Sequence, residues 1–427
     1  VDRRPVGMSA GYASSAFGLL VLLARETTAC ESDLNCSLSG VCERGACACD
    51  APWGGEHCQS LKLAPGKEGV GGIPLCAYHG DGINSSSWGA SVLQAPEDGL
   101  YYAWVASMVN ECTLDSWQQN SEVVLARSSV PLGPFERIRT LVPPWAHNPQ
   151  TIRAPDAEHG HVYALFTLGD GKNYHGGPKS CNGAPPPPAP PITPAPPWHV
   201  DKCNISTPHG AGWAGCITAN FTIFWSGMPN GTYAAHTAQI LDWPVHHTGR
   251  PWDYGAFGNW NPAPMVHPNG TIFMLVLSGQ WGFKHGDALL RADTWRGPYR
   301  LVATDSFASW GGSTANAEDP FLWVDRRGHW HALYEGNPMP GAHAYSRDGI
   351  TWSSINMADS GPSEGAFNLS RPYTAANGTQ QNVSYYTERP KLLFGADGVT
   401  PTHIFGAFGG RAPGAPSFTV VSPLATA

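Results

Sequence analysis

Two short acidic segments carry the side chains best suited to chemistry. Glu318-Asp319-Pro320 and Glu388-Arg389-Pro390 each open an apolar stretch that has the length of a β-strand. A positioned carboxyl group can give or take a proton, and adjacent like charges such as Glu318 and Asp319 raise the pKa of one of the two groups. Polar side chains before proline also commonly cap turns at strand starts. The segments therefore predict either acid–base chemistry or turn capping.

Similar segments recur along the chain at intervals of roughly sixty to ninety residues. Each unit has an apolar strand, a turn that contains glycine, and a second strand, and four of the five units open with a polar residue before proline. Charged residues make up only 14% of the chain, whereas it has 50 Gly and 39 Pro, which favours many short strands over long helices. The pattern predicts an all-β, five-bladed β-propeller. The units open at Trp88, His147, Asn261, Glu318 and Glu388.

The order of the five units, with Glu318-Asp319-Pro320 and Glu388-Arg389-Pro390 in the last two, resembles the propellers of glycoside hydrolase family 43 and its invertase-like relatives. The resemblance implies that one carboxyl protonates the leaving oxygen of a glycosidic bond while a second activates water or attacks the sugar. It implies that Glu388 is this acid, with a pKa raised by a neighbouring carboxylate, and that Asp319 orients it. Arg389 stands where the family has glycine, and Glu318 has no counterpart.

The first unit departs from the family pattern. Where the family places its general base in an Asp-Pro element, this chain has Trp88-Gly89-Ala90-Ser91, and the next two units have Asn148 and Asn261. An amide cannot act as a general base, and the two asparagines are also typical of turn caps. Asp81 or Asp115 could supply the missing carboxylate from outside these segments.

A sugar-binding funnel would also use aromatic and polar side chains, because an indole face stacks on the apolar face of a sugar ring. Histidines at 79, 147, 329 and 331 could bind sugar hydroxyls or a metal, although strand histidines are more often simply packed. No cofactor is expected, and a structural divalent ion in the funnel is left open. The predicted substrate-binding residues are Trp88, His147, Asn148, Trp260, Asn261, Trp310 and Arg389.

Six of the eleven cysteines fall within residues 30–58, a stretch too short to fold on a hydrophobic core alone. Their spacing, with Gly40 and Trp53-Gly54-Gly55, resembles an EGF-like domain. The resemblance implies the pairs Cys30–Cys42, Cys36–Cys47 and Cys49–Cys58, whereas six cysteines alone allow fifteen connectivities. Glu26-Thr27-Thr28-Ala29 lacks the residues of calcium-binding versions, and the one-residue gap of Cys47-Ala48-Cys49 disfavours zinc.

Five cysteines remain. Cys76–Cys112 and Cys181–Cys203 are the predicted bridges, and the second would close the base of a proline-rich insertion at residues 184–197. Cys216 is left over, either buried or paired with another chain. The predicted organisation is a signal peptide at 1–29, an EGF-like module at 30–58, a linker at 59–75 and the propeller at 76–427.

The beginning of the chain predicts secretion. Arg3 and Arg4 precede an apolar run at residues 17–24, which is the layout of a signal peptide and is too short for a span of roughly twenty residues. The net charge of −8 without a basic stripe argues against nucleic acid. Nine sequons predict N-glycosylation, at Asn35, Asn84, Asn204, Asn220, Asn230, Asn269, Asn368, Asn377 and Asn382.

The predicted function, implied by the resemblance, is a secreted glycoside hydrolase-like protein that cleaves glycosidic bonds in a polysaccharide or glycan. The alternative is a non-catalytic extracellular carbohydrate-binding or adhesion protein that keeps the propeller, which the absent base favours. A carbohydrate ligand is expected in both cases. An extracellular protein partner could bind through the EGF-like module.

Overall fold

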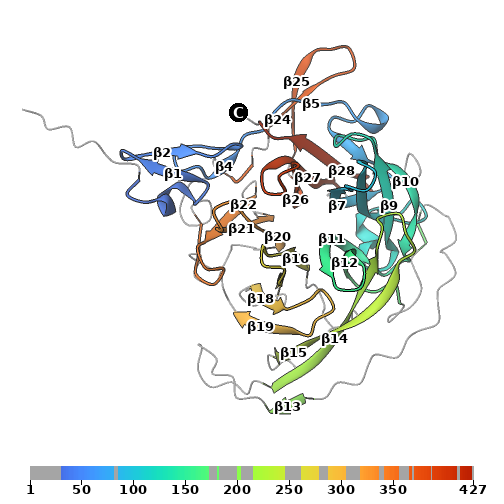
Figure 1. Ribbon diagram of the computed structural model, residues 1–427. Coiled ribbons are helices and arrows are strands. Elements are labelled where there is room, and N and C mark those ends of the chain that lie inside the picture. The colour runs from blue at the N-terminus through green and yellow to red at the C-terminus, as the bar shows by residue number, and fades with distance from the viewer. Residues whose placement is uncertain are drawn as a thin grey trace, which may run out of the picture.

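The computed structural model describes residues 30–80, 85–172, 180–181, 200–202, 215–245, 261–277, 287–303, 318–335, 341–354, 365–367, 370–385, 387–410 and 414–425. Within these ranges the chain is almost entirely β-strand, with α1 (Trp117–Asn120) and three short 3-10 helices (Asp33–Cys36, Val70–Gly72 and Leu114–Ser116). The strands surround a common centre (Figure 1). No helix in the described ranges has the length and apolar character needed to cross a membrane.

The described strands form five four-stranded antiparallel units, which we call blades one to five, and this confirms the predicted all-β propeller. Blade one is β7 (Ser87–Gln94), β8 (Tyr101–Met108), β9 (Ser121–Ser128) and β10 (Glu136–Val142); blade two is β11 (His147–Asp156), β12 (Gly160–Leu168), β14 (Gly215–Ser226) and β15 (Ala234–Val245); blade three is β16 (Ala263–Val266), β17 (Ile272–Leu277), β18 (Asp287–Ala292) and β19 (Tyr299–Ala303); blade four is β20 (Glu318–Val324), β21 (Trp330–Glu335), β22 (Ala342–Ser346) and β23 (Trp352–Ser353); blade five is β26 (Glu388–Phe394), β27 (Pro401–Gly409), β28 (Ser417–Pro423) and β6 (Cys76–Tyr78).

The first strand of each blade lies at the centre. β7, β11, β16, β20 and β26 contact one another in that order, and β26 contacts β7, so the five strands complete a ring (Figure 1). The outer strands β15 and β19 also pair in parallel, which joins blades two and three. β13 (Val200–Lys202) extends blade two by pairing with β14.

Strands from distant parts of the chain close the ring. β6 pairs with β28, so the fifth blade takes one strand from before blade one and three from the end of the chain. β5 (Gly66–Lys67) pairs in parallel with β24 (Ser370–Thr374), which pairs with β25 (Gln380–Ser384). This three-stranded sheet projects beside blade five (Figure 1).

Apolar side chains fill the space between neighbouring blades. The cluster between blades two and three contains Phe166, Trp295 and Tyr299, and the cluster between blades five and one contains Val105, Phe135 and Phe405. A blade has too little apolar surface to be stable alone, so each blade depends on the neighbours that cover its two faces.

The N-terminal module contains β1 (Gly40–Glu43), β2 (Ala46–Cys49), β3 (Trp53–Gly54) and β4 (Ser60–Leu61). Its disulfides are Cys30–Cys42, Cys36–Cys47 and Cys49–Cys58, which are the pairs expected from the sequence. The other two predicted bridges are wrong, because Cys112 pairs with Cys181 and Cys76 is a buried free thiol. The predicted pairs joined cysteines that are close together in the sequence. Cys112 instead lies after β8, and the chain that follows β12 comes back to it at Cys181.

The module is packed onto blade four rather than joined by a free linker. The ring of Trp53 stacks on His343 at 4.3 Å between centroids and lies 6.4 Å from Trp323. Arg327 donates hydrogen bonds to the carbonyls of Leu38 and Gly40 and pairs with Asp50 at 2.6 Å. The module and the propeller therefore share one core.

Several predictions fall outside the described residues: the signal peptide, the proline-rich insertion, Cys203, the side chain of Cys216, and the sequons at Asn84, Asn204 and Asn368. The six sequon asparagines within the described ranges are all exposed, as glycosylation would require: Asn35, Asn220, Asn230, Asn269, Asn377 and Asn382.

Candidate functional site

The site begins with a backbone feature that is repeated in every blade. One residue at or just before the start of each central strand has a positive φ: 78° at Gly89, 46° at Asn148, 37° at Asn261, 56° at Asp319 and 55° at Arg389. In β7, β11, β20 and β26 the ladder to the next strand shifts register at this point. Positive φ is unfavourable for residues other than glycine, so its repetition around the ring indicates a functional arrangement of these side chains.

Three of these residues form a buried network. Asn148 donates a hydrogen bond from Nδ2 to Oδ1 of Asp319 at 3.0 Å, and a guanidinium nitrogen of Arg389 lies 3.1 Å from the same oxygen. The exposed fractions of Asn148, Asp319 and Arg389 are 2%, 1% and 8%. The network links blades two, four and five at the buried side chain of Asp319.

Carboxyl groups surround this network on one side of the ring. Glu318 and Glu388 are half-buried at the starts of β20 and β26, and Glu335 is buried at the end of β21, opposite Glu318 in the ladder. Burial, followed by the charges of Asp319 and Glu388, raises the pKa of Glu318 to about 7, although Arg389 opposes the shift. Glu318 thus has a raised pKa of the kind predicted for Glu388, and the prediction for Glu388 itself stays a prediction.

A buried lysine supports the same region. Lys391 donates a hydrogen bond from Nζ to the carbonyl of Pro320 at 3.1 Å, which ties β26 to the start of β20. Burial lowers the pKa of Lys391 to about 7, while the charge of Asp319 acts in the opposite direction. Lys391 and Glu335 were not predicted, and the only signal in the sequence was a charged residue inside or at the end of an apolar strand.

Several polar atoms of the ring are buried without a hydrogen-bond partner. They are Oδ1 of Asn261, Oδ2 of Asp319, Nε of Arg389 and Nε2 of His147. Because an unpaired buried polar group costs roughly 1–3 kcal/mol, these four atoms are positions at which a water or a ligand would form hydrogen bonds. The atoms include donors and acceptors, so a polyhydroxylated ligand, whose hydroxyls can do both, fits them.

The predicted binding residues have different positions. His147 is buried, with Nδ1 2.7 Å from Oγ of Ser121, and burial followed by the charge of Arg389 lowers its pKa well below 6.5, so its ring is neutral. The amide nitrogen of Asn148 donates to Asp319 on another blade, a contact that a turn cap would not need. The prediction of a sugar platform at Trp88 is wrong, because Trp88 is 3% exposed and packs in the core with Met108 and Cys112.

The candidate bases remain without support. Asp115 is exposed and accepts a hydrogen bond from the backbone of Gly414 at 3.4 Å. Asp81, Trp260 and Trp310 lie outside the described residues. The described positive-φ residues of blades one to three are Gly89, Asn148 and Asn261, so none of these three supplies a carboxylate.

The histidines of blade four belong to the boundary with the N-terminal module. His331 and His343 are buried there, with Nδ1 of His331 3.0 Å from Nε2 of His343, and Asp325 lies 3.4 Å from His329 and 3.5 Å from His331. These side chains face Trp53 and Trp323. They are structural in this arrangement.

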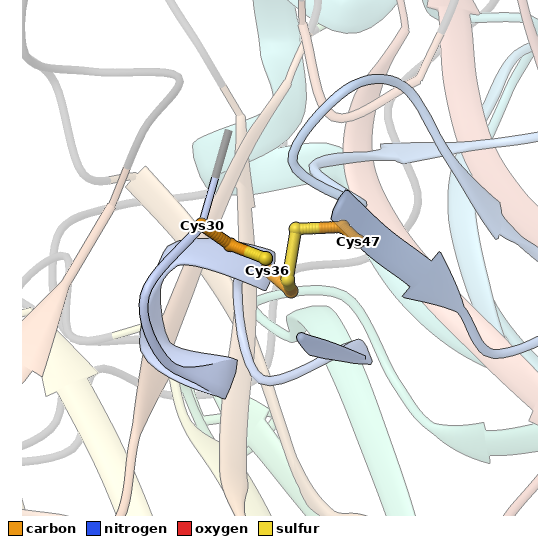
Figure 2. Close-up of side chains that lie close together, drawn as sticks. All are labelled: Cys30, Cys36 and Cys47. Carbon is orange, nitrogen blue, oxygen red and sulfur yellow. A yellow bond between two sulfur atoms is a disulfide. The ribbon is translucent and has the colours of Figure 1, made fainter. Parts of the chain in front are cut away.

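Among the described residues, one group has potential metal ligands close enough to share an ion: Cys30, Cys36 and Cys47. Figure 2 shows the three side chains close together, with the disulfide Cys36–Cys47 drawn between two of them. Cys30 is bonded to Cys42. Disulfide sulfurs are not thiolates, so the cluster is no metal site.

Comparisons with known proteins give structural similarity at low identity. No family model and no curated protein sequence matches the chain. A family 117 glycoside hydrolase, Zg3597 from the marine bacterium Zobellia galactanivorans, matches with a TM-score of 0.45 and 11% identity over 86% of this chain and 90% of the other. A GH43_1 enzyme from Xanthomonas citri matches with 0.42 and 13% over 80% and 89%. A putative exo-beta-1,3-galactanase from Bifidobacterium bifidum s17 matches with 0.41 and 9% over 86% and 97%.

Proposed function

We propose that the protein is a glycoside hydrolase-like enzyme that binds a glycan at the ring of central strands and cleaves a glycosidic bond by carboxyl acid–base chemistry. The observation that carries this proposal is the group of buried and half-buried carboxyls on β20, β21 and β26, in which Glu318 has a pKa of about 7. Crowding carboxyls in an apolar interior is destabilising, and titratable groups perturbed in this way are concentrated at catalytic sites.

In this proposal Glu318 is the proton donor and Glu388 is the second carboxylate. A pKa of about 7 leaves Glu318 substantially protonated near neutral pH, as a general acid must be. Asp319 contacts Asn148 and Arg389, and its charge is one cause of the raised pKa of Glu318. The acid therefore moves from Glu388, the residue that the family pattern implied, to its neighbour across the blade boundary.

The test is turnover on a panel of plant and algal polysaccharides and glycans, with Glu318→Gln and Glu388→Gln as variants. Glutamine keeps the shape and removes the transferable proton, so each variant should lose at least about a hundredfold in turnover while glycan binding persists. The exposed Glu136 on β10 provides the control, because Glu136→Gln leaves the carboxyls on β20, β21 and β26 unchanged. Full activity in Glu318→Gln would remove Glu318 from catalysis.

A non-catalytic glycan-binding protein is the second candidate. Gly89, Asn148 and Asn261 favour it, because these three positions offer no general base. Binding of a glycan by the wild-type protein without turnover on any member of the panel would select this function over the first.

We infer further that the protein is a secreted glycoprotein. Four disulfides are typical of an oxidising compartment, and six sequon asparagines are exposed. Expression in a eukaryotic secretory host, followed by treatment with an N-glycosidase, should increase electrophoretic mobility. The EGF-like module is the proposed surface for an extracellular protein partner.

A further inference from the structure

Among the three glutamates that surround Asp319, Glu335 is the most deeply buried. It is the last residue of β21, it lies opposite Glu318 in the antiparallel ladder, and it is 7% exposed. Glu318 is the half-buried first residue of β20, whereas Glu335 is the buried last residue of β21. The two carboxyls are therefore brought together by strand register, and each changes the cost of ionising the other.

The surroundings of Glu335 favour a neutral carboxyl. Asn148 and Arg389 both contact Oδ1 of Asp319, and no ion pair of Glu335 with a cation is formed within the described part of the chain. Lys391, the other nearby cation of blade five, directs its amine to the carbonyl of Pro320. The ionisable groups that face this region are Glu318 and Asp319 from β20, Glu388, Arg389 and Lys391 from β26, and His147 from β11.

We propose that Glu335 is a positioning residue of the site: its carboxyl holds the proton that the crowded carboxyls must share, and Glu318 is thereby left to exchange a proton with the glycan. The inference deepens the proposed function and rests on it for the role of Glu318. Oδ2 of Asp319 has no hydrogen-bond partner, and a protonated carboxyl beside it is a suitable donor.

The electrostatics agree with this geometry. Burial, followed by the charges of Asp319, Glu388 and Glu318, raises the pKa of Glu335 to about 10. Glu335 and Glu318 therefore titrate as a coupled pair with raised pKa values, and the deeper burial of Glu335 favours the proton on its carboxyl. Two carboxyls on neighbouring strands thus have separated roles, one as a fixed hydrogen-bond donor and one as the group that exchanges.

The test measures the melting temperature of the full-length protein as a function of pH, without glycan. A raised pKa in the folded state costs stability as pH rises from the unfolded value of 4.5 toward the folded value, because the unfolded chain releases a proton that the folded chain retains. Glu335→Gln keeps the shape and removes this cost. Its melting temperature relative to wild type should therefore increase between about pH 5 and about pH 9.

Two variants make the comparison specific. In Glu318→Gln the relative gain should level off near pH 7, where Glu318 itself titrates, and in the exposed Glu136→Gln no gain should appear. A constant difference between Glu335→Gln and wild type at all pH values would show a packing role alone and overturn the proposal.

A second measurement needs no variant. Infrared spectra of the wild-type protein should contain a protonated carboxyl band that persists at about pH 8 and is lost above about pH 10. Absence of the band at about pH 8 would also overturn the proposal. Neither experiment uses a substrate, so a failure to find turnover would count against the proposed function and leave the assignment of this proton intact.

Discussion

Asn148 and Asp319 form a hydrogen bond of 3.0 Å although their strands, β11 and β20, are not neighbours in the ring. β16 lies between them on one side, and β26 and β7 lie between them on the other. The bond therefore joins blades two and four across the centre of the propeller. Arg389 adds blade five, so three of the five blades meet at one carboxylate.

Replacement of Asn148 tests this central bond. In Asn148→Ala the buried carboxylate of Asp319 loses its amide donor, and we expect the free energy of unfolding to fall by about 1–3 kcal/mol. Asn148→Asp should be less stable still near neutral pH, because it places a second negative charge beside Asp319. Denaturant unfolding measures both, with the exposed Asn382→Ala as the control. A stability of Asn148→Ala equal to wild type would mean that the bond contributes nothing.

Two adjacent arginines test the docking of the N-terminal module. Arg327 bonds to Leu38, Gly40 and Asp50 of the module, whereas Arg326 is largely exposed and pairs with Asp397. We expect Arg327→Ala to lower the melting temperature and to expose the module to limited proteolysis. Arg326→Ala should change the free energy of unfolding by at most about 1 kcal/mol. Equal effects of the two substitutions would contradict the docking role of Arg327.

The histidines beneath Trp53 predict a loss of stability in acid. Burial lowers the pKa of His331 below 6.5. Burial and the charge of His331 lower the pKa of His343 well below 6.5, so the folded state keeps both rings neutral. As the pH falls below 6.5 the unfolded chain binds protons that the folded chain excludes, and stability therefore decreases. Melting temperatures between about pH 7 and about pH 5 should fall less steeply in His343→Gln than in wild type. An unchanged slope in His343→Gln would exclude His343 as the cause.

The free thiol and the long-range disulfide can be checked chemically. Burial raises the pKa of Cys76 to about 12, so this thiol should resist alkylation in the native protein and react only after denaturation. Peptide mapping without reduction should recover Cys112 joined to Cys181, together with the three pairs of the N-terminal module. Recovery of a Cys76–Cys112 peptide would contradict the structure.

The parts of the structure that the sequence predicted are those with local signals. A polar residue before proline marks the start of a central strand at Asn148, Asn261, Asp319 and Arg389, and each of these residues has a positive φ. The spacing of six cysteines resembles a known module closely enough to imply its pairing. Both signals depend on residues close together in the chain, and so the all-β class and the start of each blade could be predicted.

The parts that were missed depend on contacts between distant residues. Glu335 lies among the clustered carboxyls because the antiparallel register places it opposite Glu318. No local pattern in the sequence identifies it. Trp88 opens blade one as expected, but its indole packs against Met108 and Cys112, which a strand pattern alone does not show. The partner of Cys181 was likewise decided by how blade two returns toward the end of β8.

Because β6 pairs with β28, blade five cannot finish folding until the end of the chain has been synthesised. Synthesis runs from the N-terminus, so Cys76–Tyr78 emerges long before Ser417–Pro423, the strand that it joins. Until that last strand is released, blades one and four each lack the neighbour that covers their outer flank, and apolar side chains such as Phe135 and Trp323 have no complete partner surface. The nascent chain is therefore most exposed to aggregation just before its end is released, and a chain that stops short of residue 417 would keep an open side permanently.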